Sequence, residues 1–181
     1  MTVFSFSRYP PMLRKLTLVL CGLLALPAVA RDVEVGKPAP PLTARTLDGG
    51  DFSLQAQRGK VVIVNFWATW CSPCRKEMPA LDAYYEKHRG DGLVLLGISM
   101  DNPSDRDKVK AVMKAYHFPA AMRDDTDLSG YGRIRLIPQT YIIDRQGMVR
   151  RDGEQEKGAI DQAALEHAVD PLLQAAPAPA K

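Results

Sequence analysis

Cysteine and histidine are scarce in this chain of 181 residues, which contains three of each. A structural zinc site needs about four cysteine or histidine ligands at short spacings. Only Cys71 and Cys74 have such a spacing, and His88, His117 and His167 lie far from them and from one another. The scarcity therefore argues against a metal site, and we expect neither a metal ion nor another cofactor.

An excess of positive charge is also missing from the part of the chain that we expect to fold. Residues 1–30 contain three basic residues (Arg8, Arg14 and Lys15) and no acidic one, so without them 21 basic residues face 21 acidic ones. A net charge near zero gives no electrostatic footprint for DNA or RNA. The pI of about 8.8 comes largely from the first 30 residues, and we expect no nucleic-acid partner.

No uncharged apolar run is long enough to span a bilayer. The longest, Leu16–Ala30, has 15 residues, whereas a transmembrane helix needs roughly 20. Two basic residues precede this run, and it ends in the cleavage pattern Ala28-Val29-Ala30. These features predict a secretory signal peptide over residues 1–30 and hence an exported protein. An uncleaved segment that holds the protein at the membrane is the alternative.

The rest of the chain has no internal repeat and no linker that would divide it. Its apolar and charged contents are ordinary, enough for one domain with a sizeable core. We place this domain at residues 31–173, and we expect residues 174–181, rich in alanine and proline, to form a flexible tail.

The most informative stretch runs from Val61 to Pro79 and reads VVIVNFWATWCSPCRKEMP. Its apolar, β-branched start predicts a strand that is buried on both faces. The pattern then breaks and restarts at Cys71 with helical spacing. Cys71 and Cys74 therefore fall on the first turn of a helix that leaves the C-terminal end of a central strand, where open α/β sheets place their active sites.

This placement predicts redox chemistry for the two cysteines. Cysteines three residues apart on a helical turn share one face, so their sulfurs can form a disulfide. Cys71 lies against unpaired N–H groups and the positive end of the helix dipole, which favour the nucleophilic thiolate. Cys74 lies one turn deeper, where it can resolve a mixed disulfide formed by Cys71. A purely structural disulfide of this spacing would close almost no loop and stabilise little.

The segment NFWATWCSPCRKEMP resembles the active site of the thioredoxin superfamily, and most closely that of exported thiol–disulfide oxidoreductases of the TlpA, ResA and CcmG type. The likeness covers about residues 35–173. It implies an α/β fold, a thioredoxin-like mixed sheet flanked by helices. It also implies a reductase of disulfides in periplasmic client proteins, such as apocytochrome c in cytochrome c biogenesis, with a membrane-embedded electron donor of the DsbD or CcdA type.

The pattern along the domain predicts the other elements. Val35–Leu42 is proline-rich and should form an extended lead-in on the surface. An Asp-Gly turn between Thr43–Leu47 and Asp51–Leu54 predicts an added N-terminal β-hairpin. Asp101-Asn102-Pro103 should cap the helix that follows. We expect helices at Cys71–His88, Ser104–Tyr116 and Ala159–Leu173, strands at Leu93–Met100, Pro119–Met122, Tyr141–Asp144 and Met148–Arg151, and a loop at Asp124–Gly132.

The resemblance assigns substrate contacts to two residues, and sequence position predicts a third. Thioredoxin-like proteins place a cis-proline opposite the cysteines, and the residue before it pairs its backbone with the substrate chain. These positions correspond to Pro138 and Ile137. Trp70 precedes Cys71 and should form an apolar rim that contacts partner chains.

Proton transfer is expected to involve Glu77. Thioredoxin has a buried aspartate where this chain has Asn65, and an amide cannot take the proton that Cys74 loses when it attacks the mixed disulfide. Sequences of the ResA type resemble this chain in having a glutamate at the position of Glu77, one turn beyond Cys74. An ordinary acid that complements the helix N-terminus is the alternative. Arg75 and Lys76 are interpreted as part of a solvated helix face, and a raised positive potential around Cys71 is the alternative.

The direction of electron flow follows from the residues between the cysteines. Oxidants of the DsbA type carry a histidine there, whereas this chain has Ser72-Pro73. We therefore predict a reductant with a potential more negative than roughly −200 mV. A peroxiredoxin-like thiol peroxidase with antioxidant activity is an alternative because the lead-in and hairpin resemble that family too, although Thr69 lies two residues before Cys71 instead of three. A non-catalytic binding module with the same fold is the other alternative.

Overall fold

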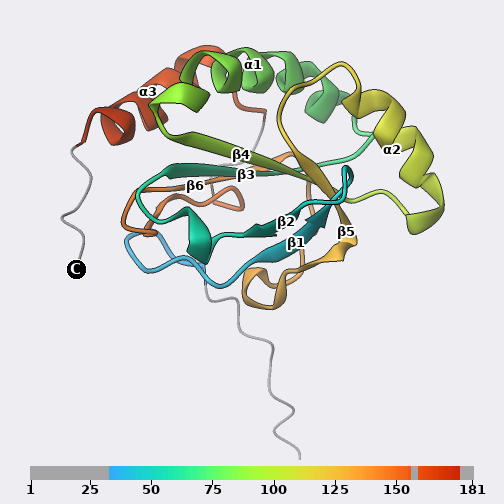
Figure 1. Ribbon diagram of the computed structural model, residues 1–181, viewed down its shortest axis with the longest axis horizontal. Coiled ribbons are helices and arrows are strands. Elements are labelled where there is room, and N and C mark those ends of the chain that lie inside the picture. Colours follow the sequence, from blue (N-terminus) through green and yellow to red (C-terminus); the bar gives the residue numbers. More distant parts are fainter. Residues whose placement is uncertain (1–32, 156–158, 176–181) are drawn as a thin grey trace, which may run out of the picture.

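The structure is a computed structural model of the chain and describes residues 33–155 and 159–175 (Figure 1). The predicted signal peptide at residues 1–30 lies outside this range. Of the predicted tail at residues 174–181, only Gln174 and Ala175 are described, and Gln174 is still helical. The outer limits of the domain therefore stay predictions.

Seven strands form one mixed sheet in the order β2-β1-β5-β4-β3-β6-β7 (Figure 1). The neighbours β3, β4 and β5 are parallel, and all other neighbours are antiparallel. The parallel strands bring their C-terminal ends to one edge of the sheet, where the cysteine segment follows β3. The strands are β1 (Thr43–Thr46), β2 (Asp51–Ser53), β3 (Val61–Trp67), β4 (Leu93–Ser99), β5 (Ala120–Asp127), β6 (Gln139–Ile143) and β7 (Val149–Arg151).

β3 lies inside the sheet and is buried on both faces, as its apolar run predicted. Its side chains alternate between two cores because successive residues of a strand point to opposite faces. Ile63 and Trp67 belong to one core, and Val62 and Phe66 belong to the other. Asn65 therefore projects, by the same alternation, toward the core of Ile63 and Trp67.

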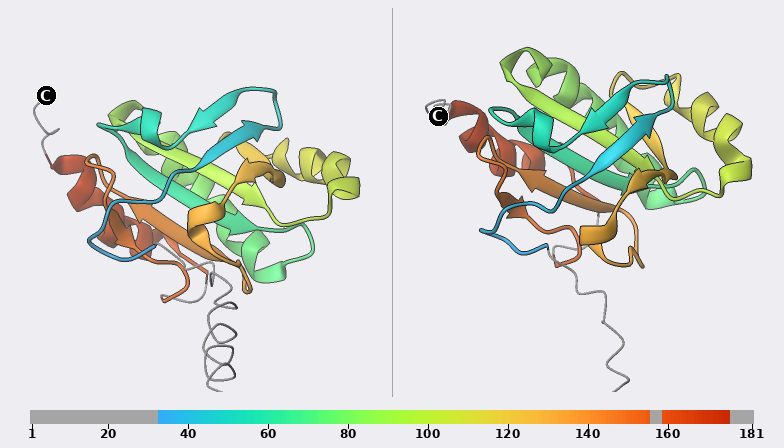
Figure 2. Two further views of the ribbon diagram at one scale, coloured as in Figure 1. Left: turned by 90° about the horizontal axis from the view of Figure 1, so that it is seen from below. Right: turned by 60° about the horizontal axis from the view of Figure 1, so that its bottom comes forward.

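The three α-helices contribute side chains to the core of Ile63 and Trp67. They are α1 (Ser72–His88), α2 (Arg106–Met113) and α3 (Gln162–Gln174). Figure 2 shows these helices on one side of the sheet and the N-terminal segment, in blue, on the other. The active-site segment thus lies between a fully buried strand and the layer of helices.

The lead-in at Val35–Leu42 was predicted to lie on the surface, and this prediction is wrong for its second half. Ala39 and Leu42 are buried in the core on the face that the α-helices leave uncovered. The segment also pairs with a sheet edge, where the N–H of Gly36 donates to the carbonyl of Val149 at 2.9 Å. Its apolar side chains are buried because they cover a sheet face that would otherwise be exposed.

The predicted hairpin is present as β1 and β2, with Gly49 at a φ of +92° in its turn. The strand predicted at Pro119–Met122 is longer than expected, because β5 continues to Asp127 and pairs with β1. The loop predicted at Asp124–Gly132 therefore begins only after Asp127. It contains a 3₁₀ turn at Ser129–Tyr131.

Two predicted helices differ from the observed ones at their ends. The helix predicted at Ser104–Tyr116 is a 3₁₀ turn at Pro103–Asp105 followed by α2, which ends at Met113. The last helix begins at Gln162 instead of Ala159. Ile160, before that helix, donates its N–H to a side chain of α1, which is described below.

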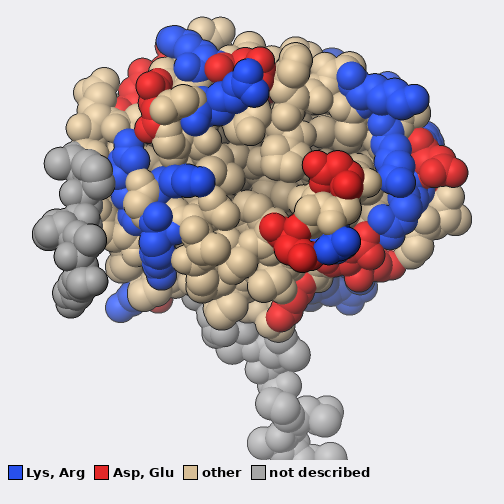
Figure 3. All heavy atoms as spheres, viewed as in Figure 1, with Lys and Arg blue, Asp and Glu red and all other residues tan. Residues whose placement is uncertain are grey.

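The surface carries charges of both signs. Figure 3 shows lysine and arginine side chains along α2 with acidic side chains close to them. Within residues 33–155 and 159–175, no helix is both long and apolar enough to cross a membrane.

Candidate active site

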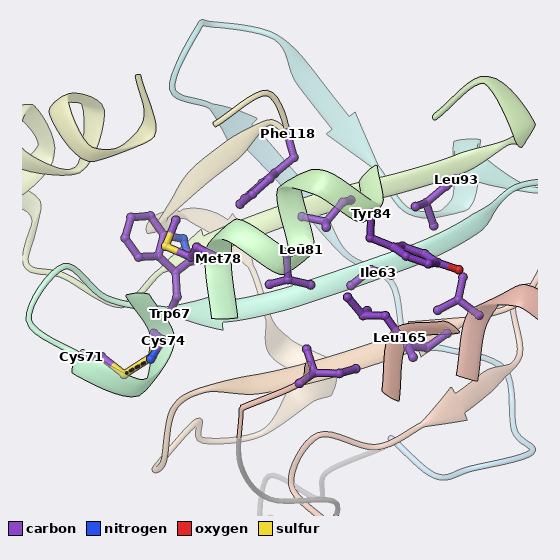
Figure 4. Close-up of a cluster of buried hydrophobic side chains, with 14 of the residues drawn as sticks. Ile63, Trp67, Cys71, Cys74, Met78, Leu81, Tyr84, Leu93, Phe118 and Leu165 are labelled. Carbon is purple, nitrogen blue, oxygen red and sulfur yellow. Dashed lines mark hydrogen bonds between the residues drawn. A yellow bond between two sulfur atoms is a disulfide. The ribbon is translucent and has the colours of Figure 1, made fainter. Parts of the chain in front are cut away.

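Cys71 and Cys74 form a disulfide at the N-terminus of α1, with an S–S distance of 2.05 Å. Cys71 is the N-cap residue, in an extended conformation, and Pro73 occupies the first turn, as predicted. The N–H of Cys74 donates to Cys71 Sγ at 3.3 Å, the dashed line in Figure 4. In the dithiol form, this N–H group and the helix dipole favour negative charge on Cys71 Sγ.

Burial makes the two sulfurs unequal. Cys74 is fully buried, whereas Cys71 keeps 5% of its surface exposed. Trp67, Met78 and Leu81 belong to the same buried cluster, which Figure 4 shows beneath the start of α1. Of the two cysteines, only Cys71 therefore keeps any surface in contact with solvent.

A turn from Ala68 to Cys71 leads into the helix, and Asp101 holds it. The N–H of Cys71 donates to the carbonyl of Ala68 at 3.1 Å. Asp101 Oδ2 accepts the N–H of Thr69 at 2.8 Å, and Asp101 Oδ1 accepts the Thr69 hydroxyl at 2.6 Å. The Ser99 hydroxyl also donates to Asp101, at 2.8 Å. Three hydrogen bonds to one buried carboxylate thus fasten the turn to the end of β4.

Of the predicted cap Asp101-Asn102-Pro103, the positions of Asn102 and Pro103 are confirmed, whereas Asp101 does not take part. Both of its carboxylate oxygens are used by Thr69 and Ser99, and Asn102 is the N-cap residue of the following 3₁₀ turn. The sequence offered no signal for this contact, because Thr69 and Asp101 are 32 positions apart.

The peptide bond between Ile137 and Pro138 is cis, as the resemblance implied. The carbonyl oxygen of Ile137 lies 3.8 Å from Cys71 Sγ, which places this loop directly beside the disulfide. A groove of about 370 Å³ adjoins it, and the apolar residues Pro73, Leu136, Ile137, Pro138 and Ala159 form much of its lining.

Two large apolar side chains are exposed at this site. Trp70, predicted as an apolar rim, is 65% exposed, and Leu136 is 61% exposed. Leu136 was missed in the sequence, where it is one apolar residue among others. Its place directly before Ile137 and Pro138 is the signal that points to it. Exposed apolar side chains beside a reactive disulfide are suited to contact with another protein.

Glu77 lies one turn after Cys74 and is almost completely buried. Its Oε1 accepts Asn65 Nδ2 at 2.7 Å, and its Oε2 accepts the N–H of Ile160 at 2.7 Å. Burial raises the pKa of Glu77 to about 7, although these two hydrogen bonds and the charge of Arg151 act in the opposite direction. The carboxyl can therefore gain and lose a proton near neutral pH.

Asn65 positions the carboxyl of Glu77. From the sequence, Asn65 was identified only as a neutral residue that cannot accept a proton. Its Nδ2 donates to Glu77 and also to Thr140 Oγ1 at 3.0 Å. Thr140 and Ile160 were not predicted at the site, because only the folded chain brings β6 to β3 and the segment before α3 to α1.

The histidines stand apart from the cysteines, as expected. His88 pairs with Asp91 at 3.0 Å, His117 pairs with Asp82 at 2.9 Å, and His167 is exposed on α3. Within the described part of the chain, no group of three or more His, Cys, Asp or Glu side chains is arranged to hold a metal ion.

Comparison with known proteins is consistent with this geometry. The model of the AhpC/TSA family matches residues 35–152, which is more than half of the chain. The chain belongs to the AhpC/TSA family. Within this family, it is 32% identical over 154 residues to the thiol-disulfide oxidoreductase ResA of Bacillus cereus, covering 80% of this chain and 88% of ResA. It is 35% identical over 121 residues to the thioredoxin-like protein YneN of Bacillus subtilis, covering 65% of this chain and 70% of YneN.

Solved structures confirm the fold of this AhpC/TSA member. A thiol:disulfide interchange protein of the thioredoxin family from Chlorobium tepidum superimposes with a TM-score of 0.66 at 30% identity, covering 78% of this chain and 99% of that one. A putative protein disulfide isomerase from Bacteroides thetaiotaomicron gives a TM-score of 0.67 at 29% identity, over 79% and 92% of the two chains. The predicted thioredoxin-like fold is confirmed, and the protein is a thiol–disulfide oxidoreductase.

Proposed function

We propose that this thiol–disulfide oxidoreductase is an exported reductase of protein disulfides, with Cys71 as the attacking and Cys74 as the resolving cysteine. The observation that supports the proposal most is the position of Cys71. Its sulfur lies 3.3 Å from the N–H of Cys74 and 3.8 Å from the carbonyl of Ile137, between the helix N-terminus and the cis-proline loop.

In the first step, the thiolate of Cys71 attacks one sulfur of the client disulfide and releases the other as a thiolate. The client is then joined to Cys71 by a mixed disulfide. The N–H of Cys74 stabilises the attacking thiolate, and Ile137 and Pro138 offer backbone to the client chain as a short β-pair. Trp70 and Leu136 supply apolar contact on the exposed side.

In the second step, Cys74 attacks Cys71 Sγ, the Cys71–Cys74 disulfide forms, and the client leaves with both of its cysteines reduced. Two electrons have passed from the protein dithiol to the client. Cys74 must lose its proton in this step, although it is fully buried. Glu77, one turn away with a pKa of about 7, is the proton acceptor, because at neutral pH it is ionised in a large fraction of molecules and is a stronger base than an ordinary carboxylate.

The proposal also specifies the cellular location, the partner proteins and the reduction potential. The pattern of residues 1–30 supports secretion, with the periplasm as the site of action. The TlpA, ResA and CcmG resemblance supports clients such as apocytochrome c and a membrane-embedded dithiol donor of the DsbD or CcdA type. The spacer Ser72-Pro73 supports a potential more negative than roughly −200 mV.

A thiol peroxidase is the competing activity, because the lead-in and the hairpin also resemble those of peroxiredoxins. Two contacts favour the reductase over it. The Thr69 hydroxyl donates to Asp101 and is therefore not available to Cys71. Cys71 forms its disulfide with Cys74 on the same helical turn, which is the dithiol pair that disulfide reduction needs.

Insulin reduction with a dithiol as the electron source tests the proposal. We expect turnover by the protein, and we expect the Cys71→Ser variant to have none. Trapping of clients as mixed disulfides on Cys74→Ser in the native compartment would then identify them. Rapid consumption of hydrogen peroxide without insulin reduction would favour the peroxidase, and client binding that survives loss of both cysteines would favour a binding module.

A further inference from the structure

Four cationic side chains without ionic partners lie on the two segments that carry the cysteine site, the start of α1 and the loop before Pro138. Arg75 and Lys76 follow Cys74 on the first turns of α1, and Arg133 and Arg135 lie in the loop that leads to Ile137. All four are exposed. Within the described residues, their side chains make no hydrogen bond or ion pair.

Arginines elsewhere on the described surface are mostly paired. Ion pairs hold four of them at 2.6 to 3.3 Å, namely Arg45–Asp51, Arg89–Glu86, Arg106–Asp125 and Arg150–Asp144. The unpaired charges at the cysteine site therefore differ from the interspersed charges seen over α2 in Figure 3. A solvated helix face accounts for Arg75 and Lys76 on α1. It does not account for the unpaired Arg133 and Arg135, which belong to a separate loop.

The groove beside the disulfide lies between α1, which carries Arg75 and Lys76, and the loop that carries Arg133 and Arg135. Arg135 and Pro73 both line it, so the loop of Arg133 and the first turn of α1 meet at this groove. Glu154 is the acidic residue among those lining it, and it is not without a partner of its own. The groove thus combines an apolar lining around Leu136 with the unpaired charge of Arg135.

We infer that the cysteine site selects partner proteins whose disulfide is flanked by acidic residues. This inference rests on the proposed reductase function and specifies its clients. The client segment binds in extended form, with an apolar side chain in the groove near Leu136 and with carboxylates facing Arg133, Arg135 and the first turn of α1. Charges at the rim of an interface act mainly on the rate of association, and salt weakens their effect.

Single-turnover reduction of matched cyclic peptides tests the inference. The peptides share one disulfide and one neighbouring leucine and differ only in flanking residues, which are glutamates, glutamines or lysines. The dithiol form of the protein is mixed with each peptide, and formation of the Cys71–Cys74 disulfide is followed. At about 20 mM salt, we expect the glutamate peptide to react about tenfold faster than the lysine peptide, and at about 500 mM salt we expect nearly equal rates.

Variants identify the charges responsible. Arg133→Gln combined with Arg135→Gln should remove most of the preference for the glutamate peptide. The matched control combines Lys60→Gln with Lys87→Gln, which removes two exposed cations at the start of β3 and the end of α1, and it should keep the preference. Both double variants should reduce the small neutral 2-hydroxyethyl disulfide at the wild-type rate, because that reagent senses only the thiols.

The outcomes separate this inference from the proposed function. Equal rates for the three peptides at low salt, or a preference for lysine, would overturn the inference and leave the reductase intact. A preference that persists in the Arg133 and Arg135 double variant would overturn it as well. Failure to reduce any peptide or the neutral disulfide would instead remove the reductase function on which it rests.

Discussion

The amide of Asn65 donates to the carboxyl of Glu77 at 2.7 Å, inside the core and directly beneath the reactive helix turn. Asn65 comes from the central strand and Glu77 from α1. The pair thus links the sheet to the helix that carries both cysteines. A neutral donor holds the carboxyl in place without adding a charge, and burial is then free to raise the pKa of Glu77 to about 7.

Replacement of Glu77 by Gln should slow the resolving step. Without a proton acceptor near Cys74, we expect turnover in insulin reduction to fall about a hundredfold, with the mixed disulfide accumulating. The wild-type rate should rise as the pH increases through about 7, where Glu77 ionises, and the variant should lose this rise. Glu86→Gln, which changes an acid on the same helix that pairs with Arg89, is the control and should keep both the rate and the pH profile.

The same carboxyl should make stability depend on pH. The folded protein holds the proton of Glu77 up to a pKa of about 7, whereas the unfolded chain releases it near 4.5. The folded state thus binds more protons between these values, so stability falls as the pH rises through this window, by about 3 kcal/mol. Urea unfolding of the disulfide form from pH 4 to 8 measures this change, and Glu77→Gln should lack it. Identical pH slopes in the two proteins would contradict a raised pKa.

The contact between Thr69 and Asp101 should influence Cys71 as well as stability. Thr69→Val removes the hydroxyl that donates to Asp101 at 2.6 Å and loosens the turn that ends at Cys71. We expect stability to fall by about 1–3 kcal/mol and iodoacetamide alkylation of Cys71 at neutral pH to slow several-fold. Thr69→Ser should restore both. Tyr84 lies farther along α1, and its hydroxyl donates to Asp170 of α3 at 2.5 Å. Tyr84→Phe removes this hydrogen bond and should lower stability without changing alkylation.

Leu136 should contribute to client binding more than to the chemistry of the thiols. Leu136→Ser removes an exposed apolar side chain from the groove. We expect the KM for insulin to rise several-fold, while the rate with 2-hydroxyethyl disulfide stays unchanged. Steady-state kinetics with both substrates provides the measurement. Equal losses with the protein and the small substrate would instead assign Leu136 a role in the structure of the cysteine site.

The features predicted correctly from the sequence are those that a short segment determines. The buried strand, the helix that begins after Cys71 and the disulfide to Cys74 follow from one stretch of apolar periodicity and one cysteine spacing. The cis bond before Pro138 came from the family resemblance and not from local composition. These features depend little on the arrangement of distant segments.

The features missed depend on contacts between distant segments. Asp101 has the sequence context of a helix cap, and only the adjacent ends of β3 and β4 bring it to Thr69. The second half of β5 reads as a loop because Arg123–Asp127 is polar, yet pairing with β1 makes it a strand, as strand preference depends on the neighbouring strand. The proline-rich lead-in reads as surface, but the uncovered sheet face buries Leu42.

The central claim is that the N-terminus of α1 activates Cys71 as the nucleophile. Its most direct test is the pH dependence of alkylation of Cys71 in the Cys74→Ser variant, which keeps the N–H group at position 74. The account predicts a thiol pKa for Cys71 clearly below the value of about 8.5 for free cysteine. Two results together would contradict it: a pKa at or above that value in the variant, and a wild-type protein that does not cycle with a dithiol.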